Sequence, residues 1–419
     1  MRNFNACCFF ALLAALFWLL PASAEGFATR EELRSAYAAL GSAPSSSPYA
    51  EAPSVAAPYA AGSLRPESLA DAEAYLNFLR RLAGLEGAVA LDDSLNGICQ
   101  RGAVLLAALE RVDHQPEKPG DMPDDFYQVA SYATASSNLA GLNWMKNDIL
   151  RTALEYFARD DGALNLPVLG HRRWLLNPDM ALTGLGLANS ASGMTYALMF
   201  AHDLSGQAEW RQICWPSPGA FPAELMHTDL AWSVTLNPEV YDLSASSPAV
   251  MIRELGSGTE YSFPYPAGDY ADGYFIVNEE PYGGGPCLIF RPDLKKADLE
   301  EYLQNQRWEV RVTGLKYADG GDAELRYVTE MAALRAIDAA SVEISRQELA
   351  LRPGETAELS AEVVPSWADD VSVTWSSSDT AVARVDGTGT VTAVGPGACQ
   401  IIAESANRRW DVCAVTVAE

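Results

Sequence analysis

Apolar residues recur with different spacings along this chain, and no single fold satisfies all of them. From Pro66 to about Leu109 they recur at helical spacing. Beyond Trp210, short β-type runs such as 287–290 dominate, and after about Ala340 apolar and polar residues alternate almost to the C-terminus. A chain of 419 residues also exceeds the roughly 100–200 residues of a typical domain. We therefore expect a multi-domain α+β protein.

The first 24 residues have the pattern of an export signal. Arg2 precedes an apolar run over residues 6–20, and Ala22-Ser23-Ala24 then offers a small-residue cleavage site, so the mature chain is expected to start at Glu25. No later apolar stretch approaches the roughly 20 residues that a membrane-spanning helix needs. These features predict a secreted or surface-associated extracellular protein with no transmembrane segment in its mature form.

The charge balance argues against nucleic acid as a partner. The formal net charge is −26, and loss of Arg2 with the signal leaves 28 basic against 55 acidic residues, or −27. Nucleic-acid binding requires a clustered basic surface that releases counterions from phosphates. An acidic chain of this kind would instead repel a phosphate backbone.

Composition predicts where the domains divide. Residues 25–65 are expected to be a linker, because 42–63 is dominated by Ser, Pro and Ala and has too little apolar surface to fold. Residues 66–205 combine helical and strand-like patterns, 206–335 form an all-β domain, and 340–419 form a last β domain.

The last domain resembles the bacterial immunoglobulin-like domain, group 2. The resemblance rests on four spaced segments: Leu351-Arg-Pro-Gly-Glu-Thr-Ala357, Val373-Thr-Trp-Ser-Ser-Ser-Asp379, Val382-Ala-Arg-Val-Asp386 and Gly389-Thr-Val-Thr-Ala393. It implies an immunoglobulin-like β-sandwich in which Trp375 packs toward the space between the sheets. In surface proteins such a module is a spacer or an adhesive unit.

Residues 68–200 resemble the CAP superfamily of cysteine-rich secretory (SCP-like) proteins, in the form found in bacteria. The motifs are Leu76-Asn-Phe-Leu-Arg-Arg-Leu82, Asp113-His114, Ser136-Ser137-Asn138-Leu-Ala140, Gly170-His-Arg-Arg-Trp-Leu-Leu-Asn-Pro178 and Thr183-Gly-Leu-Gly-Leu-Ala188. The resemblance implies an α-β-α sandwich with a cleft over its central sheet. Trp215-Pro-Ser-Pro-Gly219 is similar to β-rich extensions that follow such domains.

The CAP resemblance also implies a set of cleft residues. Many relatives gather two histidines and two acids there, and the histidines correspond to His114 and His171. Where the family has Gly-Glu-Asn, this chain has Ser136-Ser137-Asn138, so a hydroxyl replaces the first carboxylate. Ser137 and Asn138 remain cleft candidates.

The second acid of that set would come from the helix before Gly170. Asp160 is the first candidate, and Glu155 and Asp161 are alternatives. Two imidazoles and one carboxylate fall short of the three or four good ligands that zinc takes. The interpretation is that any divalent metal held by His114, His171 and Asp160 binds weakly, no better than micromolar, with His114 and His171 facing each other. The alternative is that both histidines only form hydrogen bonds in a polar cleft.

Five cysteines remain after the signal is removed, in a compartment where disulfides persist. Cys99 lies on an apolar helical stripe and is predicted to be a buried thiol. Cys214 is predicted to pair with Cys287. Cys399 and Cys413 flank a tight turn, so we expect them directly opposite each other in a hairpin, where a disulfide is possible.

Two functional hypotheses remain open at this stage. The first is a non-catalytic binding protein whose CAP cleft takes an extracellular protein, glycan or lipid ligand, with no cofactor required. The second is a metal-dependent or histidine-assisted hydrolase acting on an extracellular peptide, lipid or cell-wall substrate. No catalytic residue can be assigned from the motifs alone. Loss of turnover and of bound metal in His114→Ala and His171→Ala variants would favour the enzyme.

Overall fold

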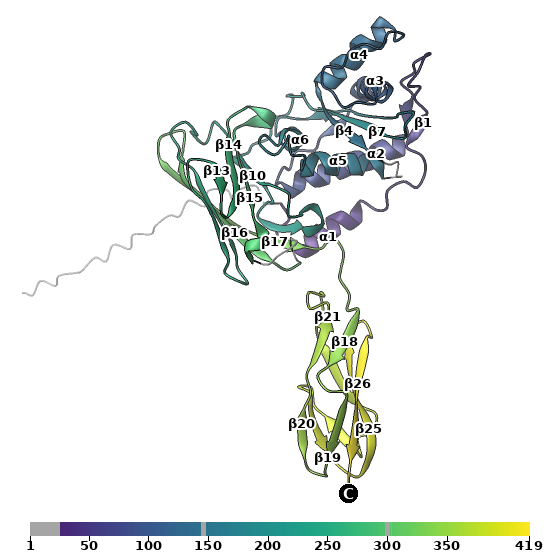
Figure 1. The fold of residues 1–419 in the computed structure, drawn as a ribbon, viewed down its shortest axis with the longest axis vertical. Helices are drawn as coiled ribbons and strands as arrows, with labels where there is room; N and C mark the ends of the chain where they lie inside the picture. The colour runs from purple at the N-terminus through teal and green to yellow at the C-terminus, as the bar shows by residue number, and fades with distance from the viewer. Residues whose placement is uncertain (1–25, 144–147, 298–301, 303) are drawn as a thin grey trace, which may run out of the picture.

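The computed structural model describes residues 26–143, 148–297, 302 and 304–419. The predicted export signal over residues 1–24 lies outside the described residues. The described chain is β-rich, with its α-helices confined to the N-terminal unit and a separate β unit at the C-terminus (Figure 1). Within the described ranges, no helix is both long and apolar enough to cross a bilayer.

The N-terminal unit is built around a three-stranded antiparallel sheet with the order β4-β7-β6. Helices α3 and α4 cover one face of the sheet, and α2 and α5 cover the other (Figure 1). The elements are α2 (Pro66–Leu82), β3 (Ala90–Leu91), α3 (Asp93–Leu109), α4 (Asp124–Ala135), β4 (Ser137–Leu142), α5 (Ile149–Arg159), α6 (Gly170–Leu175), β5 (Leu182–Thr183), β6 (Leu185–Asn189) and β7 (Thr195–Phe200).

Local sequence determines how closely α3 approaches the sheet. The helix begins after Asp92, whose carboxylate accepts a hydrogen bond from the N–H of Leu95 and so caps the N-terminus. Gly186 on β6 then lets the strand pack directly on the helix, since a Cβ at this position would lie 2.2 Å from the carbonyl carbon of Cys99. Any larger residue at Gly186 would push helix and sheet apart.

The middle unit consists of two five-stranded sheets, ordered β13-β14-β15-β10-β8 and β12-β11-β16-β17-β9. Buried aromatic residues, including Trp232 and Trp308, pack between them with ring centroids 6.0 Å apart. The strands are β8 (Gln212–Trp215), β9 (Gly219–Pro222), β10 (Trp232–Leu236), β11 (Ala249–Glu254), β12 (Glu260–Phe263), β13 (Gly268–Tyr270), β14 (Gly273–Asn278), β15 (Cys287–Pro292), β16 (Arg307–Lys316) and β17 (Asp322–Ala332).

The segment expected to be a linker is instead partly folded onto both units. It contains α1 (Arg30–Ala39), β1 (Tyr49–Glu51) and β2 (Ser63–Leu64). Phe27 and Leu33 are almost fully buried, in the same apolar cluster that runs through the N-terminal and middle units. The linker prediction was therefore wrong for this stretch. That prediction rested on the Ser, Pro and Ala content of the segment. A few apolar residues are enough to anchor such a segment when neighbouring units supply the rest of the hydrophobic core.

The C-terminal unit has a hydrophobic cluster of its own. Its strands are β18 (Ser341–Ile344), β19 (Glu348–Leu351), β20 (Thr356–Glu358), β21 (Ala361–Val364), β22 (Val373–Ser377), β23 (Ala383–Val385), β24 (Thr390–Ala393), β25 (Gly397–Ser405) and β26 (Trp410–Val417). Trp375 packs half-buried against this core. In the loop between β21 and β22, Asp369 forms an ion pair with Arg34 of α1 at 2.8 Å.

All five described cysteines are free. For Cys214 and Cys287, the strand register explains why no disulfide forms. Cys214 lies opposite Val234 of β10, whereas Cys287 lies opposite Thr235. Val234 and Thr235 are consecutive, so the two cysteines project from opposite faces of the sheet. The predicted disulfide between Cys214 and Cys287 was therefore wrong.

Cys399 and Cys413 both face the C-terminal core, but they are not directly opposite. Cys399 pairs with Val415, and Ile401 pairs with Cys413. The thiols are thus diagonal neighbours, too far apart for a disulfide without a change of register. The strand partner of Cys399 lies two positions later than Cys413, so the turn is centred one residue later than the prediction requires. Arg408, which lies in this turn, adopts a left-handed conformation with φ 65°.

Candidate functional site

Among the residues that the sequence assigned to a cleft, the structure defines His171, near the start of α6, best. Its Nδ1 lies 3.0 Å from Oδ1 of Asp160, and its backbone carbonyl accepts a hydrogen bond of 2.8 Å from the Asn138 amide. Asp160 ends α5 in a left-handed conformation with φ 50°, which turns its carboxylate toward α6. The structure therefore brings together three of the five residues singled out from the sequence.

Two groups contact the Nδ1 atom of His171. Oδ1 of Asp160 lies 3.0 Å away and can only accept a hydrogen bond, whereas Nδ2 of Asn165 lies 3.1 Å away and can only donate one. When Nδ1 carries the proton, it donates to Asp160, and Nε2 of the neutral ring is a lone-pair acceptor. No hydrogen bond links Nε2 of His171 to any residue in the described part of the chain, and the side chain is 16% exposed. The Nε2 edge of His171 is therefore open to a hydrogen bond from outside the protein.

Asp160 itself is not accessible to a ligand. Its side chain is fully buried, and Oδ2 accepts a second hydrogen bond from the backbone N–H of Arg172 at 3.2 Å. The two alternative acids lie elsewhere. Glu155 accepts a hydrogen bond from the Tyr75 hydroxyl, and Asp161 pairs with Nε2 of His227 at 3.0 Å. Asp160 is thus the acid beside His171, and its role is to hold the ring.

Ser137 lies on the other face of the sheet from Asn138. Its hydroxyl is 3.8 Å from the thiol of Cys99 on α3. Adjacent residues of a strand project to opposite faces, so Ser137 points away from His171 while Asn138 points toward it. Burial raises the pKa of the Cys99 thiol to about 12, which keeps this neighbour protonated. The serine therefore stabilises the layer between the sheet and α3.

His114 has a different environment from His171. It is exposed, and its Nδ1 lies 2.8 Å from the backbone carbonyl of Thr134. The nearby residue that sequence reasoning missed is His202, whose ring centroid is 4.7 Å from that of Trp174. Burial lowers the pKa of His202, and the charge of His114 lowers it further. That His114 and His171 face each other across one cleft stays a prediction.

The predicted ligand set does not fit a metal ion. No group of three or more His, Cys, Asp or Glu residues among the described positions has the geometry to hold one. Both oxygens of Asp160 are already used, by His171 and by the N–H of Arg172. Joint ligation by His114, His171 and Asp160 therefore has no support from the described geometry, because the carboxylate that would complete the set is fully buried beside His171.

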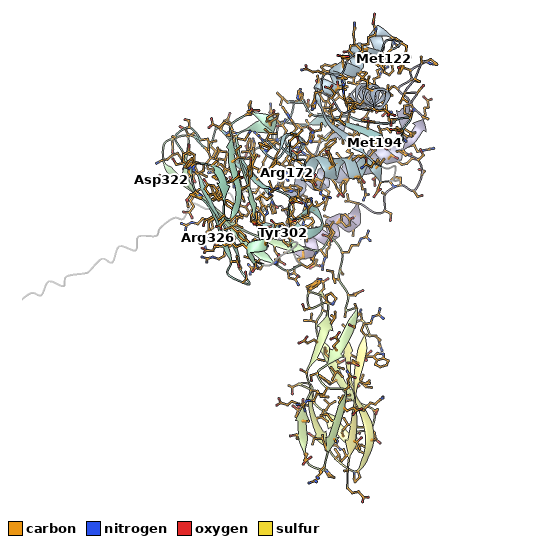
Figure 2. The ribbon with its side chains drawn as sticks, in the orientation of Figure 1. Met122, Arg172, Met194, Tyr302, Asp322 and Arg326 are labelled. Carbon is orange, nitrogen blue, oxygen red and sulfur yellow. The ribbon has the colours of Figure 1, made fainter. Side chains whose placement is uncertain are left out.

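Two arginines that follow His171 join the N-terminal unit to the middle unit. Arg172 donates to the carbonyl of Ala231 at 2.7 Å and to the hydroxyl of Ser233 at 3.2 Å. Arg173 donates to the side chain of Asn278 at 2.7 Å and to the carbonyl of Gly285, also at 2.7 Å. Figure 2 shows Arg172 where the helices meet the β sheets. The motif that suggested a cleft therefore also forms the interface between the units.

Comparisons with known proteins support one of the two resemblances. Residues 338–409 match the bacterial Ig-like domain, group 2, which confirms that assignment for the C-terminal unit. A lacto-N-biosidase of Bifidobacterium bifidum is 40% identical over 92 residues, which are 22% of this chain and only 8% of that protein. The bacterial Ig-like match supports an extracellular or cell-surface location.

Two solved structures show weaker likeness. An intimin mutant of EHEC O157:H7 is 21% identical over 18% of this chain and 45% of its own, with a TM-score of 0.15. Domains 4 and 5 of the S-layer protein SbsC are 15% identical over 26% of this chain and 65% of their own, with a TM-score of 0.20. Likeness at this level does not establish a shared fold.

Proposed function

We propose that this chain is a secreted or surface-associated binding protein, with a CAP-like N-terminal unit that contacts an extracellular ligand and a C-terminal immunoglobulin-like unit that acts as spacer or adhesive module. Helices on both faces of the β4-β7-β6 sheet support the CAP-like assignment. So does the position of the Gly170–Pro178 motif, which begins α6 beside the sheet.

One observation carries the choice of binding over catalysis. Ser137, the nucleophile that a serine hydrolase would need near His171, is turned to the opposite face of the sheet, and the fully buried Asp160 can hold the ring of His171 but cannot contact a ligand. The groups that remain accessible are the edge of His171, whose side chain is 16% exposed, and the exposed His202, whose ring packs at a tilt against Trp174. A hydrogen-bond acceptor beside an aromatic surface is suited to recognition.

The proposal can be tested with the four histidines of the chain. The mature protein would be applied to an array of immobilised extracellular proteins, glycans and lipids, and the strongest signal would be followed by titration. His202→Ala should weaken that binding about tenfold, the effect of losing a central contact. His227→Ala is the comparison variant, because Nε2 of His227 is already engaged by Asp161 at 3.0 Å. Equal binding by the wild type and His202→Ala would contradict the proposal.

A hydrolase remains the second candidate because of the Asp160–His171 pair. In that role Nε2 of His171 would take a proton from a water molecule attacking an extracellular peptide, lipid or cell-wall substrate, and Asp160 would stabilise the resulting imidazolium. The test is release of product from these substrates by the wild type and by His171→Ala. Turnover that disappears in His171→Ala but persists in His227→Ala would favour the enzyme over the binding protein.

A further inference from the structure

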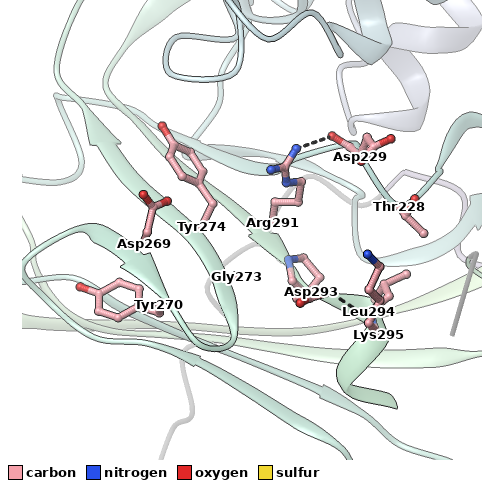
Figure 3. Close-up of a pocket in the computed structure, with 11 residues that line it drawn as sticks. Thr228, Asp229, Asp269, Tyr270, Gly273, Tyr274, Arg291, Asp293, Leu294 and Lys295 are labelled. Carbon is pink, nitrogen blue, oxygen red and sulfur yellow. Dashed lines mark hydrogen bonds between the residues drawn. The ribbon is translucent and has the colours of Figure 1, made fainter. Parts of the chain in front are cut away.

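The middle unit contains a cavity of about 940 Å³ that the proposed function does not use (Figure 3). This size is comparable to known ligand sites of about 300–1,000 Å³. The cavity lies at the end of the sheet formed by β13, β14 and β15, beside the loop that precedes β10. The lining residues on which the inference rests are Asp229, Asp269, Tyr274, Arg291, Asp293 and Lys295.

Strand register places three of these side chains in one row. Asp269 pairs with Tyr274 across β13 and β14, and Tyr274 pairs with Arg291 across β14 and β15. Directly paired residues share a face of the sheet, with Cβ atoms about 4.5–5.5 Å apart. Figure 3 shows Asp269, Tyr274 and Arg291 projecting to the same side. Gly273 makes this spacing possible, because a Cβ there would lie 2.0 Å from the carbonyl oxygen of Arg291.

The ring of Tyr274, the middle residue of this row, is held in place by apolar neighbours. Tyr274 packs half-buried against a small cluster that includes Leu169 and Ile289. Burial raises the pKa of Tyr274, and the neighbouring charge of Asp269 raises it further, so the phenol stays neutral. Its hydroxyl has no hydrogen-bond partner among the described residues. The ring is thus a fixed aromatic surface with a free polar end.

Hydrogen-bonding groups on either side of the ring are available to a ligand. Arg291 uses one Nη to donate to the backbone carbonyl of Asp229 at 3.3 Å, and its other donors have no partner in the described ranges. Asp269 and Asp293 are exposed carboxylates that can only accept. Lys295 adds an exposed cation at the rim. Donors and acceptors therefore alternate around one aromatic surface.

The mixture of carboxylates and cationic groups restricts which kind of ligand the cavity can bind. An anionic ligand would meet three carboxylates, and a cationic ligand would meet a guanidinium and an ammonium group. A neutral polyhydroxylated ligand avoids both conflicts, because each hydroxyl can donate to a carboxylate and accept from an arginine or lysine. The apolar face of a sugar ring can also pack on the tyrosine.

We propose that this cavity binds a neutral carbohydrate, with Tyr274 as the surface on which a sugar ring packs, Arg291 as hydrogen-bond donor and Asp269 as acceptor. The site is independent of the proposed function, since it lies in the middle unit and includes none of the histidines. It assigns a carbohydrate to a site outside the CAP-like unit.

The test is affinity electrophoresis of the mature chain in native gels containing soluble neutral polysaccharides: a β-glucan, a mannan, a galactan and a xylan. An anionic polygalacturonate gel provides the charge comparison. At least one neutral polymer should retard the wild type, and Tyr274→Ala should weaken that binding about tenfold. Tyr274→Phe keeps the ring and should retain most of the binding, and a thermal melt of both variants reports on folding.

Two controls keep the outcomes distinct. Trp410→Ala removes an aromatic side chain that is 64% exposed on the C-terminal unit, and it should bind as the wild type does. His202→Ala should also leave carbohydrate binding unchanged, whatever its effect on the proposed function. Three results would overturn the inference: no retardation by any neutral polymer, retardation by polygalacturonate alone, or a folded Tyr274→Ala variant that binds normally. Binding lost only in His202→Ala would move the carbohydrate to the histidine surface and likewise refute this site.

Discussion

Replacement of Arg172 by alanine should destabilise the N-terminal and middle units together by about 5 kcal/mol. Arg172 is 1% exposed and donates to the carbonyls of Ala158, Arg159 and Ala231 at 2.6, 2.6 and 2.7 Å. Each buried acceptor left without a partner costs about 1–3 kcal/mol, so three cost about 3–9 kcal/mol. Burial of the charge offsets part of this, since it lowers the pKa of Arg172 to about 10.

The assay is differential scanning calorimetry of the mature chain. For a large domain about 1 kcal/mol changes Tm by about 2 °C, so the transition of the joined units should fall by about 10 °C. The C-terminal unit has a separate core, and its transition should not move. Arg311→Ala is the matched control, because Arg311 forms an exposed ion pair with Glu324 of the kind that contributes less than about 1 kcal/mol. If Arg172→Ala shifts the transition no more than Arg311→Ala does, the reasoning about this interface is refuted.

Three further predictions concern the backbone, pH and the thiols. Gly283→Ala should cost about 3 kcal/mol, because its Cβ would lie 1.8 Å from the carbonyl oxygen of Arg173. Gly193→Ala, also at a positive φ but with no atom within 4 Å of the added Cβ, should cost about 1 kcal/mol, and urea titration compares the two variants. The hydrogen bond from the N–H of Ile344 is the main reason that the pKa of Asp411 is lowered. The charged carboxylate therefore stabilises the C-terminal unit above about pH 4, and this stability is lost as the pH falls. Thermal melts of Asp411→Asn should show a smaller dependence on acid pH than those of the wild type. Peptide mapping of the secreted protein should find Cys399 and Cys413 unlinked, and a peptide joined through them would contradict the register.

The C-terminal immunoglobulin-like unit was predictable because its signals lie in short stretches of sequence. Apolar alternation and turn residues are local signals, and they are dense enough in the last 80 or so residues to identify the immunoglobulin-like unit, which the family match over 338–409 confirms. The folded part of the 25–65 segment escaped prediction because Phe27 and Leu33 are buried by residues far along the chain. Composition describes what a segment contains, and it does not describe what its neighbours provide.

For the candidate site, too, local sequence motifs were informative and contacts between distant residues were not predictable. From the sequence alone, the CAP resemblance implied that His171, Asn138 and an acid before Gly170 belong to one site, because these residues lie within recognisable local motifs. Only the tertiary structure decided that Asp160 is fully buried, that Ser137 points to the opposite face, and that His202 packs against Trp174. These outcomes depend on which face of its strand each residue occupies and on contacts between elements that are distant in sequence. A change of one residue in register reverses the face of a side chain, and no local pattern carries that information.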